Sequence, residues 1–337
     1  MINRPAAAIH RYSRAMKNIL VLGATGFVGR HVCEKLARLQ WRITAPTRRL
    51  DNARHILSLP LLLPLEADIH DEATLTRLVA GHDAVVNLVA ILHGDAAAFE
   101  RAHVALPQKL ARACAATGVR RVVHVSALGA DAKAPSLYQR SKAAGEVALQ
   151  TAAAAGALDL TVLRPSLIFG REDRSINLFA RLQHLLPVML LASPEAQFQP
   201  VWVEDVAQAV VRCLQDRHTI GQTIEACGAE VYTLRQLVQR AGQWAGTNGH
   251  QGCPVIGLPA ALGRLQARLM ELLPGEPLMS RDNLLAMSVP NIASGLHPGL
   301  SALGISAAPL SGIAPSYLGV RDMRSGLDTL RRNAASR

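Results

Sequence analysis

The sequence predicts an α/β fold in which a doubly wound parallel sheet precedes a smaller, irregular C-terminal region. The first half of the 337 residues alternates short apolar runs, rich in β-branched side chains, with segments of helical periodicity. A glycine-rich turn joins the first apolar run to the first helical segment. Aromatic residues make up only 4% of a chain that is 50% hydrophobic, which favours Ala- and Leu-rich helices on a sheet over an all-β protein.

The elements of the first half follow one another in a regular order. The expected strands cover residues 18–23, 41–46, 62–68, 83–90, 120–126 and 158–165. The expected helices cover residues 26–39, 71–81 and 99–117, and a further one carries Tyr138 and Lys142 to about Gly156. Pro107 is expected to kink or interrupt its helix. Repeated βα units imply parallel strands joined by right-handed crossovers.

The turn after the first strand reads VLGATGFVG and places Gly23, Gly26 and Gly29 as GxxGxxG. The first glycine permits a tight turn, the second lets the backbone approach a pyrophosphate, and the third allows close packing of helix on strand. The N–H groups at the start of the helix then favour an anion. Because a strand precedes this loop and a helix follows it, the loop predicts a Rossmann-type dinucleotide-binding core.

The residues after the second strand indicate which dinucleotide is bound. An acid at this place holds the ribose 2′-hydroxyl of NAD, whereas arginine accommodates the 2′-phosphate of NADP. Arg48 and Arg49 follow the strand and Asp51 lies slightly too far along, so NADP(H) is favoured over NAD(H). The alternative is that the two arginines form a solvated surface pair. Asp68, which closes the third strand, either accepts a hydrogen bond from the adenine amine or caps the next helix.

Beyond about residue 170 the alternation of strand and helix patterns loosens. Helical patterns cover residues 174–186, 203–215 and 233–245, and Asp205 is expected to cap the second of these helices. Residues 290–320 are rich in turn residues, so no regular structure is predicted there.

The predicted organisation is a basic N-terminal extension at 1–16, an NAD(P)-binding core at 17–170, and a mixed C-terminal part at 171–337 that completes the sheet and covers the substrate side. The extension is interpreted as residues ahead of a start at Met16, and a transit peptide is the alternative.

The composition argues against several functional classes. The net charge of +11 is concentrated in residues 1–17 and 321–337 and is otherwise dispersed, without the basic face that nucleic-acid binding requires. The five cysteines are scattered and the histidines lack metal-ligand spacing, so neither a disulfide framework nor a metal site is expected. No apolar run approaches the roughly 18 residues that span a bilayer. The expected partner is therefore a small molecule or a protein.

Several motifs together resemble the extended or atypical short-chain dehydrogenases/reductases. They are GATGFVG at 23–29, NLVA at 87–90, Ser126, a Tyr-x-x-x-Lys at 138–142 and LRPSLIFG at 163–170. The further runs PTRR, EADIHD, HVSALGAD and FQPVWVEDVA are similar to one branch, the nucleotide-binding accessory subunit of respiratory complex I and its bacterial relatives. The likeness spans about residues 17–245. It implies a nucleotide site made of Gly23, Thr25, Gly26, Phe27, Val28, Gly29, Arg48, Arg49, Asp68, Ile69, Leu88, Val89, Ala90, Tyr138, Lys142 and Pro165.

The same resemblance implies catalytic roles for Ser126, Tyr138 and Lys142. In the wider superfamily the serine hydrogen-bonds the substrate, the tyrosine transfers a proton, and the lysine grips the nicotinamide ribose. Lys142 lies one helical turn after Tyr138 and therefore on the same helix face. It is also expected to lower the pKa of Tyr138, because an unperturbed tyrosine with a pKa near ~10 is a poor base at neutral pH. Ala90 stands where relatives often have glycine, which adds a methyl near the expected adenosine path.

Three functions remain open at this point. The first is an NADP(H)-binding accessory subunit on a respiratory membrane complex, located in the cytoplasm or peripherally on the cytoplasmic face of the inner membrane. The second is a free reductase or epimerase that uses Ser126, Tyr138 and Lys142 on a small carbonyl compound or a nucleotide sugar. The third is a sensor that reads the NADPH/NADP⁺ ratio and binds a protein partner without turnover. The resemblance to the complex I branch favours the first.

Overall fold

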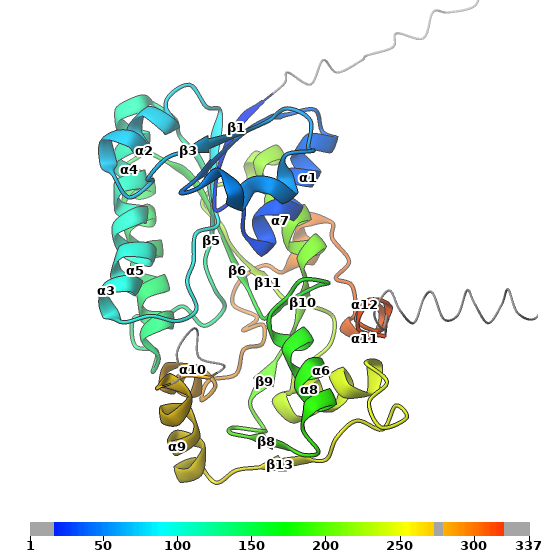
Figure 1. The fold of residues 1–337 in the computed structure, drawn as a ribbon. Coiled ribbons are helices and arrows are strands. Elements are labelled where there is room, and N and C mark those ends of the chain that lie inside the picture. Colours follow the sequence, from blue (N-terminus) through cyan, green and yellow to red (C-terminus); the bar gives the residue numbers. More distant parts are fainter. Residues whose placement is uncertain (1–16, 273–278, 320–337) are drawn as a thin grey trace, which may run out of the picture.

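A computed structural model describes residues 17–272 and 279–319, and its centre is a seven-stranded parallel sheet (Figure 1). The strand order is β11-β6-β5-β4-β1-β2-β3. The strands are β1 (Asn18–Leu22), β2 (Arg42–Thr47), β3 (Leu62–Glu66), β4 (Ala84–Asn87), β5 (Arg121–Val125), β6 (Asp159–Pro165) and β11 (Thr223–Ala226). The strand order reverses between β1 and β4. In doubly wound sheets, ligands bind at the carboxyl ends of the strands on either side of such a reversal. The predicted fold class is confirmed.

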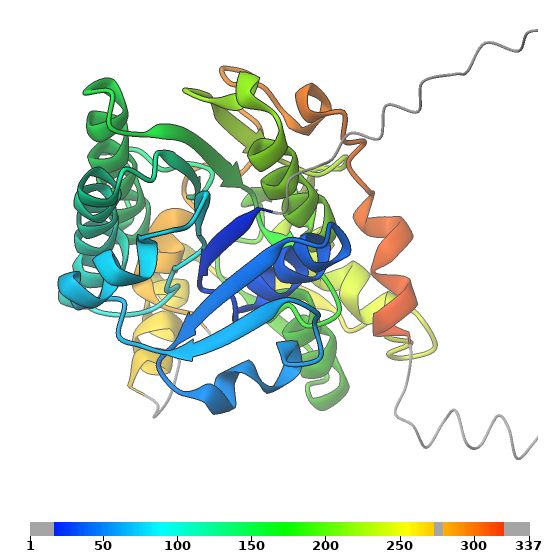
Figure 2. The ribbon, with the colours of Figure 1, turned by 90° about the horizontal axis from the view of Figure 1, so that it is seen from above.

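Two helical layers cover the sheet, as Figure 2 shows from above. The helices of the first layer are α1 (Phe27–Arg38) and α7 (Val203–Gln215), and those of the second are α2 (Glu72–Val79), α4 (Leu106–Thr117) and α5 (Leu137–Ala154). Each layer buries its own apolar core against one face of the strands. Alternate strand residues serve the two cores, so that Val122 packs toward the second layer and Val123 toward the first. Burial on both faces explains why the strands are continuous apolar runs.

The helix expected at 99–117 is divided, as Pro107 predicted. α3 (Ala96–Phe99) continues into a π-helical segment, η2 (Glu100–Ala105), and then into α4. Pro107 lies in the first turn of α4. It has no N–H to donate, and the hydrogen-bond pattern widens directly ahead of it.

A second, smaller body follows β6 and carries the helices predicted at 174–186 and 233–245. Its elements are β7 (Ile168–Phe169), α6 (Ser175–Leu185), β8 (Met189–Leu191), β9 (Gln197–Phe198), β10 (Val201–Trp202), β12 (Tyr232–Thr233), α8 (Leu234–Trp244), β13 (Val255–Gly257), α9 (Ala260–Glu271) and α10 (Arg281–Ala286). Its strands pair two by two, and its cores lie around α6 and α8. β11 returns from this part of the chain and joins the main sheet beside β6.

Some sequence expectations need correction. Residues 290–320, for which no regular structure was predicted, contain the short helices η4 (Leu300–Leu303), α11 (Leu310–Ile313) and α12 (Pro315–Leu318). Two short 3-10 helices, η1 (Leu50–Ile56) and η3 (Arg217–Thr219), were also not predicted. Asp205 does not cap α7, because it lies inside the first turn and its carboxylate accepts a hydrogen bond from Ala308 N at 2.8 Å. The extension at 1–16 lies outside the described residues.

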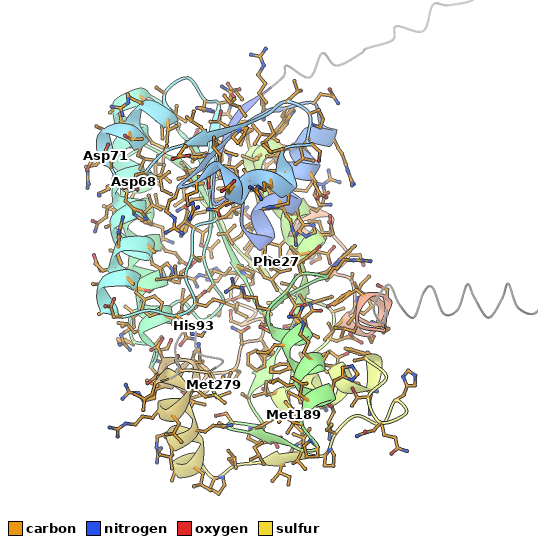
Figure 3. All side chains as sticks on the ribbon, in the orientation of Figure 1. Phe27, Asp68, Asp71, His93, Met189 and Met279 are labelled. Carbon is orange, nitrogen blue, oxygen red and sulfur yellow. The ribbon has the colours of Figure 1, made fainter. Side chains whose placement is uncertain are left out.

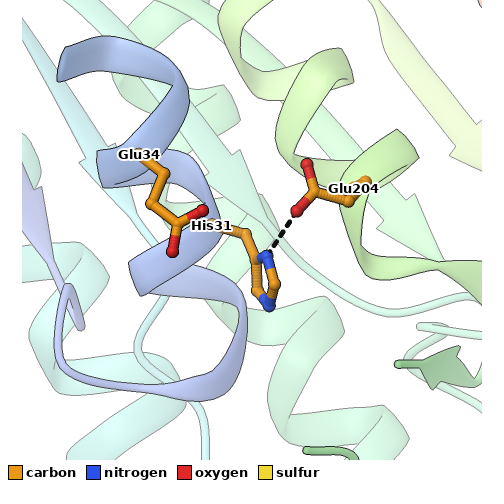
Figure 4. Close-up of side chains that lie close together, drawn as sticks. All are labelled: His31, Glu34 and Glu204. Carbon is orange, nitrogen blue, oxygen red and sulfur yellow. Dashed lines mark hydrogen bonds and ion pairs between the residues drawn. The ribbon is translucent and has the colours of Figure 1, made fainter. Parts of the chain in front are cut away.

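Charged side chains join α1 to α7 at the edge of the first layer. The His31 ring donates to the carboxylate of Glu204 over 2.6 Å, and Lys35 lies 2.7 Å from its other oxygen. His31, Glu34 and Glu204 lie close together, and the atoms with which they could coordinate a metal ion lie within 4.8 Å of one another (Figure 4). Because Lys35 already neutralises Glu204, this cluster serves helix packing.

No helix in the part of the chain that the structure describes has both the length and the hydropathy needed to cross a bilayer.

Candidate nucleotide-binding and catalytic site

The glycine loop lies at the point where the strand order reverses. Gly23 follows β1 with φ of +85°, a conformation that favours glycine, and Gly26 N donates to Gly23 O at 3.0 Å to close the turn. Leu88 and Val89, which follow β4, pass so close that a Cβ on Gly23 would lie 3.2 Å from the Leu88 carbonyl carbon. Gly29 packs directly on the backbone of Gly23 and Ala24. The sequence motif thus brings β1, β4 and α1 together.

The second glycine of the loop leaves room for a ligand. Gly26 is exposed, and a Cβ added there would meet Gly23 O at 3.3 Å, a tight contact that would require a small shift of the backbone. Gly26 is also the N-cap of α1, where no side chain caps the helix and the first turn has no acid. The first N–H groups of a helix have no intrahelical acceptor, and the helix dipole adds partial positive charge. This end of α1 therefore fits an anionic group such as a pyrophosphate.

The other residues of the loop have mixed surroundings. Thr25 and Val28 are half-buried. Phe27 packs its ring against His31, with the ring planes perpendicular, and against the backbone of Gly170. Figure 3 labels Phe27 near the junction between the sheet and the smaller body. Phe27 therefore helps to join the loop to the segment that follows β7.

The end of β2 presents two exposed arginines. Arg48 and Arg49 follow the strand, and Arg49 lies 3.9 Å from Asp51, whose carboxylate is already bound by Arg54 at 2.8 Å. Among the described residues, no carboxylate lies within ion-pair distance of Arg48. This end of the sheet therefore carries positive charge that its own acids do not fully neutralise.

Asp68 was expected either to bind an adenine amine or to cap a helix, and the second alternative is wrong. The N-cap of α2 is Asp71, whose carboxylate accepts from Thr74 N at 2.8 Å. Asp68 accepts from His70 N at 2.9 Å, and it follows the end of β3 by two residues. Figure 3 labels the two aspartates side by side. Asp68 thus stays available at the carboxyl edge of the sheet.

The strand expected at 83–90 ends at Asn87, because the Asn87 side chain turns the chain. Its carbonyl oxygen accepts from Val89 N at 3.2 Å, and its amide hydrogen-bonds Nδ1 of His124 at 3.1 Å. The next residues therefore form a loop, in which Leu88 packs toward the first core and Val89, like Ile69, toward the second. Ala90 is exposed. Pro165, at the end of β6, is buried.

Two buried polar groups at the end of β5 have no hydrogen-bond partner within the described chain. Ser126 Oγ is one, and Nε2 of His124 is the other. The two residues are only 5% and 2% exposed. A buried polar atom without a partner is destabilising, and such atoms concentrate where a ligand completes the bonding. His124 and Ser126 are two residues apart and so lie on the same face of the sheet.

Tyr138 lies in the first turn of α5 and is held by two aromatic rings. Its ring centroid is 6.2 Å from that of Phe99 and 5.6 Å from that of His103, both in edge-to-face arrangements. Ser136 caps the helix by accepting from Gln139 N at 3.1 Å. Burial raises the pKa of Tyr138 to about 12. This differs from the expectation that Lys142 lowers that pKa.

Lys142 lies one turn after Tyr138 and is buried. Its ammonium donates to the carbonyl oxygen of Val125 at 2.9 Å, directly before Ser126. Burial lowers the pKa of Lys142 to about 8, and the nearby carboxylate of Glu146 opposes that shift. Glu146 itself is held by the guanidinium of Arg164 at 2.6 Å. Lys142 therefore joins α5 to the end of β5, and with a pKa of about 8 it stays mostly charged at neutral pH.

His103, which no sequence signal marked, connects β4 to α5. Its Nε2 accepts from Ile91 N at 3.0 Å, so Nδ1 carries the proton and donates to Ser141 Oγ at 2.8 Å. Ser141 in turn donates to the carbonyl of Tyr138 at 2.8 Å. Burial and the charge of Lys142 lower the pKa of His103 to about 3, so the ring is neutral. This chain of bonds fixes the loop after β4 against the helix that carries Tyr138.

Asp282, from α10 in the smaller body, also reaches α5. Its carboxylate accepts from Leu137 N at 2.6 Å and from Tyr138 N at 3.0 Å. Sequence reasoning missed this contact because the partners are 144 residues apart and Asp282 stands in no motif. The two sequence-distant parts of the chain thus meet at the residue expected to transfer a proton.

Comparison with known proteins agrees with this geometry. The model of the NAD dependent epimerase/dehydratase family matches residues 19–227. The chain is 31% identical over 299 residues to the mitochondrial NADH dehydrogenase (ubiquinone) 1 alpha subcomplex subunit 9 of Rattus norvegicus, an alignment that covers 86% of this chain and 76% of that protein. It is 31% identical over 200 residues to a ceramide reductase of Caulobacter vibrioides, covering 57% of this chain and 59% of that protein.

Among solved structures, the fold is similar to UDP-glucuronic acid 4-epimerase from Bacillus cereus in complex with UDP-glucuronic acid and NAD. The TM-score is 0.64 at 18% identity, and the likeness covers 89% of this chain and 98% of that one. The fold class and the family resemblance that the sequence motifs indicated are confirmed by these comparisons.

Proposed function

The chain belongs to the NAD dependent epimerase/dehydratase family, and from this premise we propose that it binds NADP(H) at the Gly23–Gly29 loop and acts as an accessory subunit of a respiratory membrane complex. Nucleotide binding is supported above all by the exposed Gly26 at the start of α1, where no side chain caps the helix. The accessory role is supported by likeness along most of the chain to a subunit of mitochondrial NADH dehydrogenase. Its proposed location is the cytoplasm, peripherally on the cytoplasmic face of the inner membrane.

The bound nucleotide would use groups that follow β1 and β3 together with two residues of α5. The pyrophosphate fits the start of α1, the adenine amine fits Asp68, and the ribose of the nicotinamide half fits Tyr138 and Lys142. NAD(P) supplies a hydride acceptor or donor when it is bound. The chain itself supplies charge, orientation and a proton site at the Tyr138 hydroxyl oxygen.

The preference for NADP(H) over NAD(H) is supported by Arg48 and Arg49. A 2′-phosphate needs cationic donors that internal acids do not already occupy, and Arg48 meets that condition. We propose titration of the purified chain with NADPH and NADH, in wild type and in the double variant Arg48→Gln/Arg49→Gln. NADPH should lose roughly tenfold to 100-fold in affinity, because the loss of even one charge-assisted bond costs about 1.5–3 kcal/mol, while NADH affinity should change little.

Arg54→Gln provides the matched control for this titration. Arg54 is as exposed as Arg49 and binds Asp51, yet it lies one helical turn away from the strand end. It should leave both affinities unchanged. Wild-type protein that binds NADH as tightly as NADPH would overturn the preference.

The accessory role is tested separately by native size fractionation of gently solubilised membranes and of cytosol from the source cells. An antibody against this chain should detect it with the large respiratory complex. Detection only as a small soluble species would sink the accessory role and leave nucleotide binding intact.

The second candidate is a free reductase or epimerase, supported by the buried, unpartnered Ser126 Oγ beside the Lys142–Val125 contact. Here Ser126 would hold the substrate oxygen and Tyr138 would give or take its proton. Screening NADPH consumption against carbonyl compounds, including long-chain keto-lipids, tests this function. Tyr138→Phe should abolish turnover while the chain still binds the nucleotide, with an affinity lowered only by the loss of the hydroxyl contact to the ribose. Tight nucleotide binding without any turnover would instead favour a sensor that binds a protein partner.

A further inference from the structure

Helix α9 presents its large apolar side chains to solvent. The residues that pack inward are small, Gly263 and Ala267, and a Cβ on Gly263 would come within 2.8 Å of the Ala192 side chain. On the opposite side stand Leu262, Leu265 and Leu269. At 3.6 residues per turn, these leucines and Leu272, which follows the helix, lie within an arc of about 80°. The polarity of an ordinary surface helix is thus inverted.

The leucines of α9 continue onto the neighbouring strand pair. Leu190 on β8 and Ile256 on β13 are direct partners in register, so they project on one side of the pair. The side chain of Gln266 links α9 to Leu190 O. We call the six residues the α9 patch, namely Leu190, Ile256, Leu262, Leu265, Leu269 and Leu272, and each has 50% to 76% of its surface exposed. Figure 1 shows α9, β8 and β13 at the end of the molecule that is farthest from β1.

Two guanidinium groups stand beside the α9 patch. Arg264 and Arg268 are exposed on α9, at about 80° and 40° from Leu272 around the helix. Neither has a carboxylate partner among residues 17–272 and 279–319. The nearby acid Glu271 is already bound by Arg281 at 2.8 Å. The face is therefore apolar along its middle and cationic along one border.

We propose that the α9 patch binds the surface of an anionic lipid bilayer, with the leucines in the acyl boundary and the two arginines on lipid phosphates. A helix that lies in the plane of a bilayer has this composition, since long basic side chains reach the headgroups while apolar ones enter the interface. Anionic lipid complements Arg264 and Arg268, which no internal acid neutralises. The inference stands apart from nucleotide binding, because the patch uses none of the residues of that site.

Vesicle sedimentation with the full chain tests this proposal. Vesicles of phosphatidylglycerol and phosphatidylcholine should bind the wild type, and vesicles of phosphatidylcholine alone should bind it more weakly. Leu265→Glu/Leu269→Glu should reduce binding by about 100-fold or more, because two apolar side chains can no longer be buried. Arg264→Gln/Arg268→Gln should reduce binding to the anionic vesicles by roughly 30-fold and leave the neutral vesicles unaffected.

The control variant is Leu57→Glu/Val147→Glu, whose residues are 55% and 56% exposed and lie outside the α9 patch. It should bind vesicles like the wild type. Circular dichroism and NADPH titration check that each variant is folded. No binding of wild type to anionic vesicles, or equal loss in the control variant, would overturn the proposal. A dimer in vesicle-free solution that Leu265→Glu/Leu269→Glu dissociates would overturn it as well, because a second copy would then cover the patch.

Discussion

The carboxylate of Asp282 accepts a hydrogen bond from the backbone N–H of Tyr138, 144 residues earlier in the chain. It also accepts from Leu137 N, so one side chain of the smaller body satisfies two free N–H groups at the start of α5. Negative charge at this end of a helix is favourable. The position of Tyr138 thus depends on a residue outside the sheet-bearing half.

Asp282→Ala is expected to lower the free energy of unfolding by about 1–2 kcal/mol, the usual effect of losing a helix cap. It should also weaken NADPH binding, since the turn with Tyr138 and Lys142 loses an anchor. Urea denaturation and nucleotide titration measure the two effects. Asp71→Ala removes the cap of α2 and serves as control, because it should affect stability without affecting nucleotide affinity. Unchanged stability in Asp282→Ala would contradict the capping role.

Gly26→Ala is expected to fold but to bind nucleotide at least about tenfold more weakly, because the new methyl occupies the space for the pyrophosphate. The free energy of unfolding should change by only about 1 kcal/mol. Fluorescence titration with NADPH measures the affinity. Gly312→Ala is a matched control, since its added Cβ also meets one atom at 3.3 Å, from Pro309, away from the loop. Wild-type affinity in Gly26→Ala would place the nucleotide elsewhere.

Lys142→Met should change stability in a pH-dependent manner. The pKa of Lys142 is lowered from an ordinary 10.5 to about 8, mainly by burial. Between these two pH values the unfolded chain holds a proton that the folded chain lacks, so the stability of the wild type rises with pH there. At pH 7 the variant should be more stable by up to about 2 kcal/mol, after allowance for the lost bond to Val125.

The advantage of Lys142→Met should shrink as the pH rises above 8 and should reverse above about pH 10.5. Thermal and chemical denaturation across this range provide the measurement. Lys133→Met alters an exposed lysine and should show no such trend. A pH-independent difference between wild type and Lys142→Met would show that Lys142 is charged throughout in the folded protein.

Glu204→Gln should destabilise the contact between α1 and α7 by about 1–3 kcal/mol at pH 7. The hydrogen bond from His31, helped by Lys35, lowers the pKa of Glu204 from 4.5 to about 2. A carboxylate whose pKa is lower in the folded chain than in the unfolded chain stabilises the fold at pH values above the unfolded-chain pKa. That stabilisation is lost as the pH falls to the folded-chain pKa. The difference in the free energy of unfolding between Glu204→Gln and the wild type should therefore be constant above about pH 5 and should disappear as the pH falls from 4.5 to about 2. Glu34→Gln, in the same cluster, should show little effect.

Much of the fold follows from the sequence because its signals are local. The six strands of the first half and the helices at 174–186, 203–215 and 233–245 rest on periodicity within single segments. Pro107 also acts locally, through its missing N–H. The end of β4 was placed three residues too late, because Val89 and the two residues beside it read as an apolar run. The turn depends on Asn87 and its contact with His124, which lies on another strand.

The tight turn of the glycine loop could also be predicted, since its glycines encode that geometry locally. The surroundings of Tyr138 could not. His103, Asp282 and Phe99 reach it from three separate elements, and only the folded chain brings them together. The sequence does contain a signal for His124. Side chains alternate between the two faces of a strand, so His124, two residues before Ser126, lies on the same face of the sheet as Ser126. The pKa of Tyr138 likewise follows from burial, which spacing alone does not report.

The hydrogen bond between Asp282 and Tyr138 also imposes an order on biosynthesis. The strands β1 to β6 have all been made once residue 165 is translated, so most of the sheet can assemble while the remaining chain is still being synthesised. The two hydrogen bonds that Asp282 accepts at the start of α5 cannot form until Asp282 has left the ribosome, more than a hundred residues later. The nascent protein therefore passes through a stage in which most of its sheet can form while two N–H groups in the first turn of α5 still lack the carboxylate of Asp282.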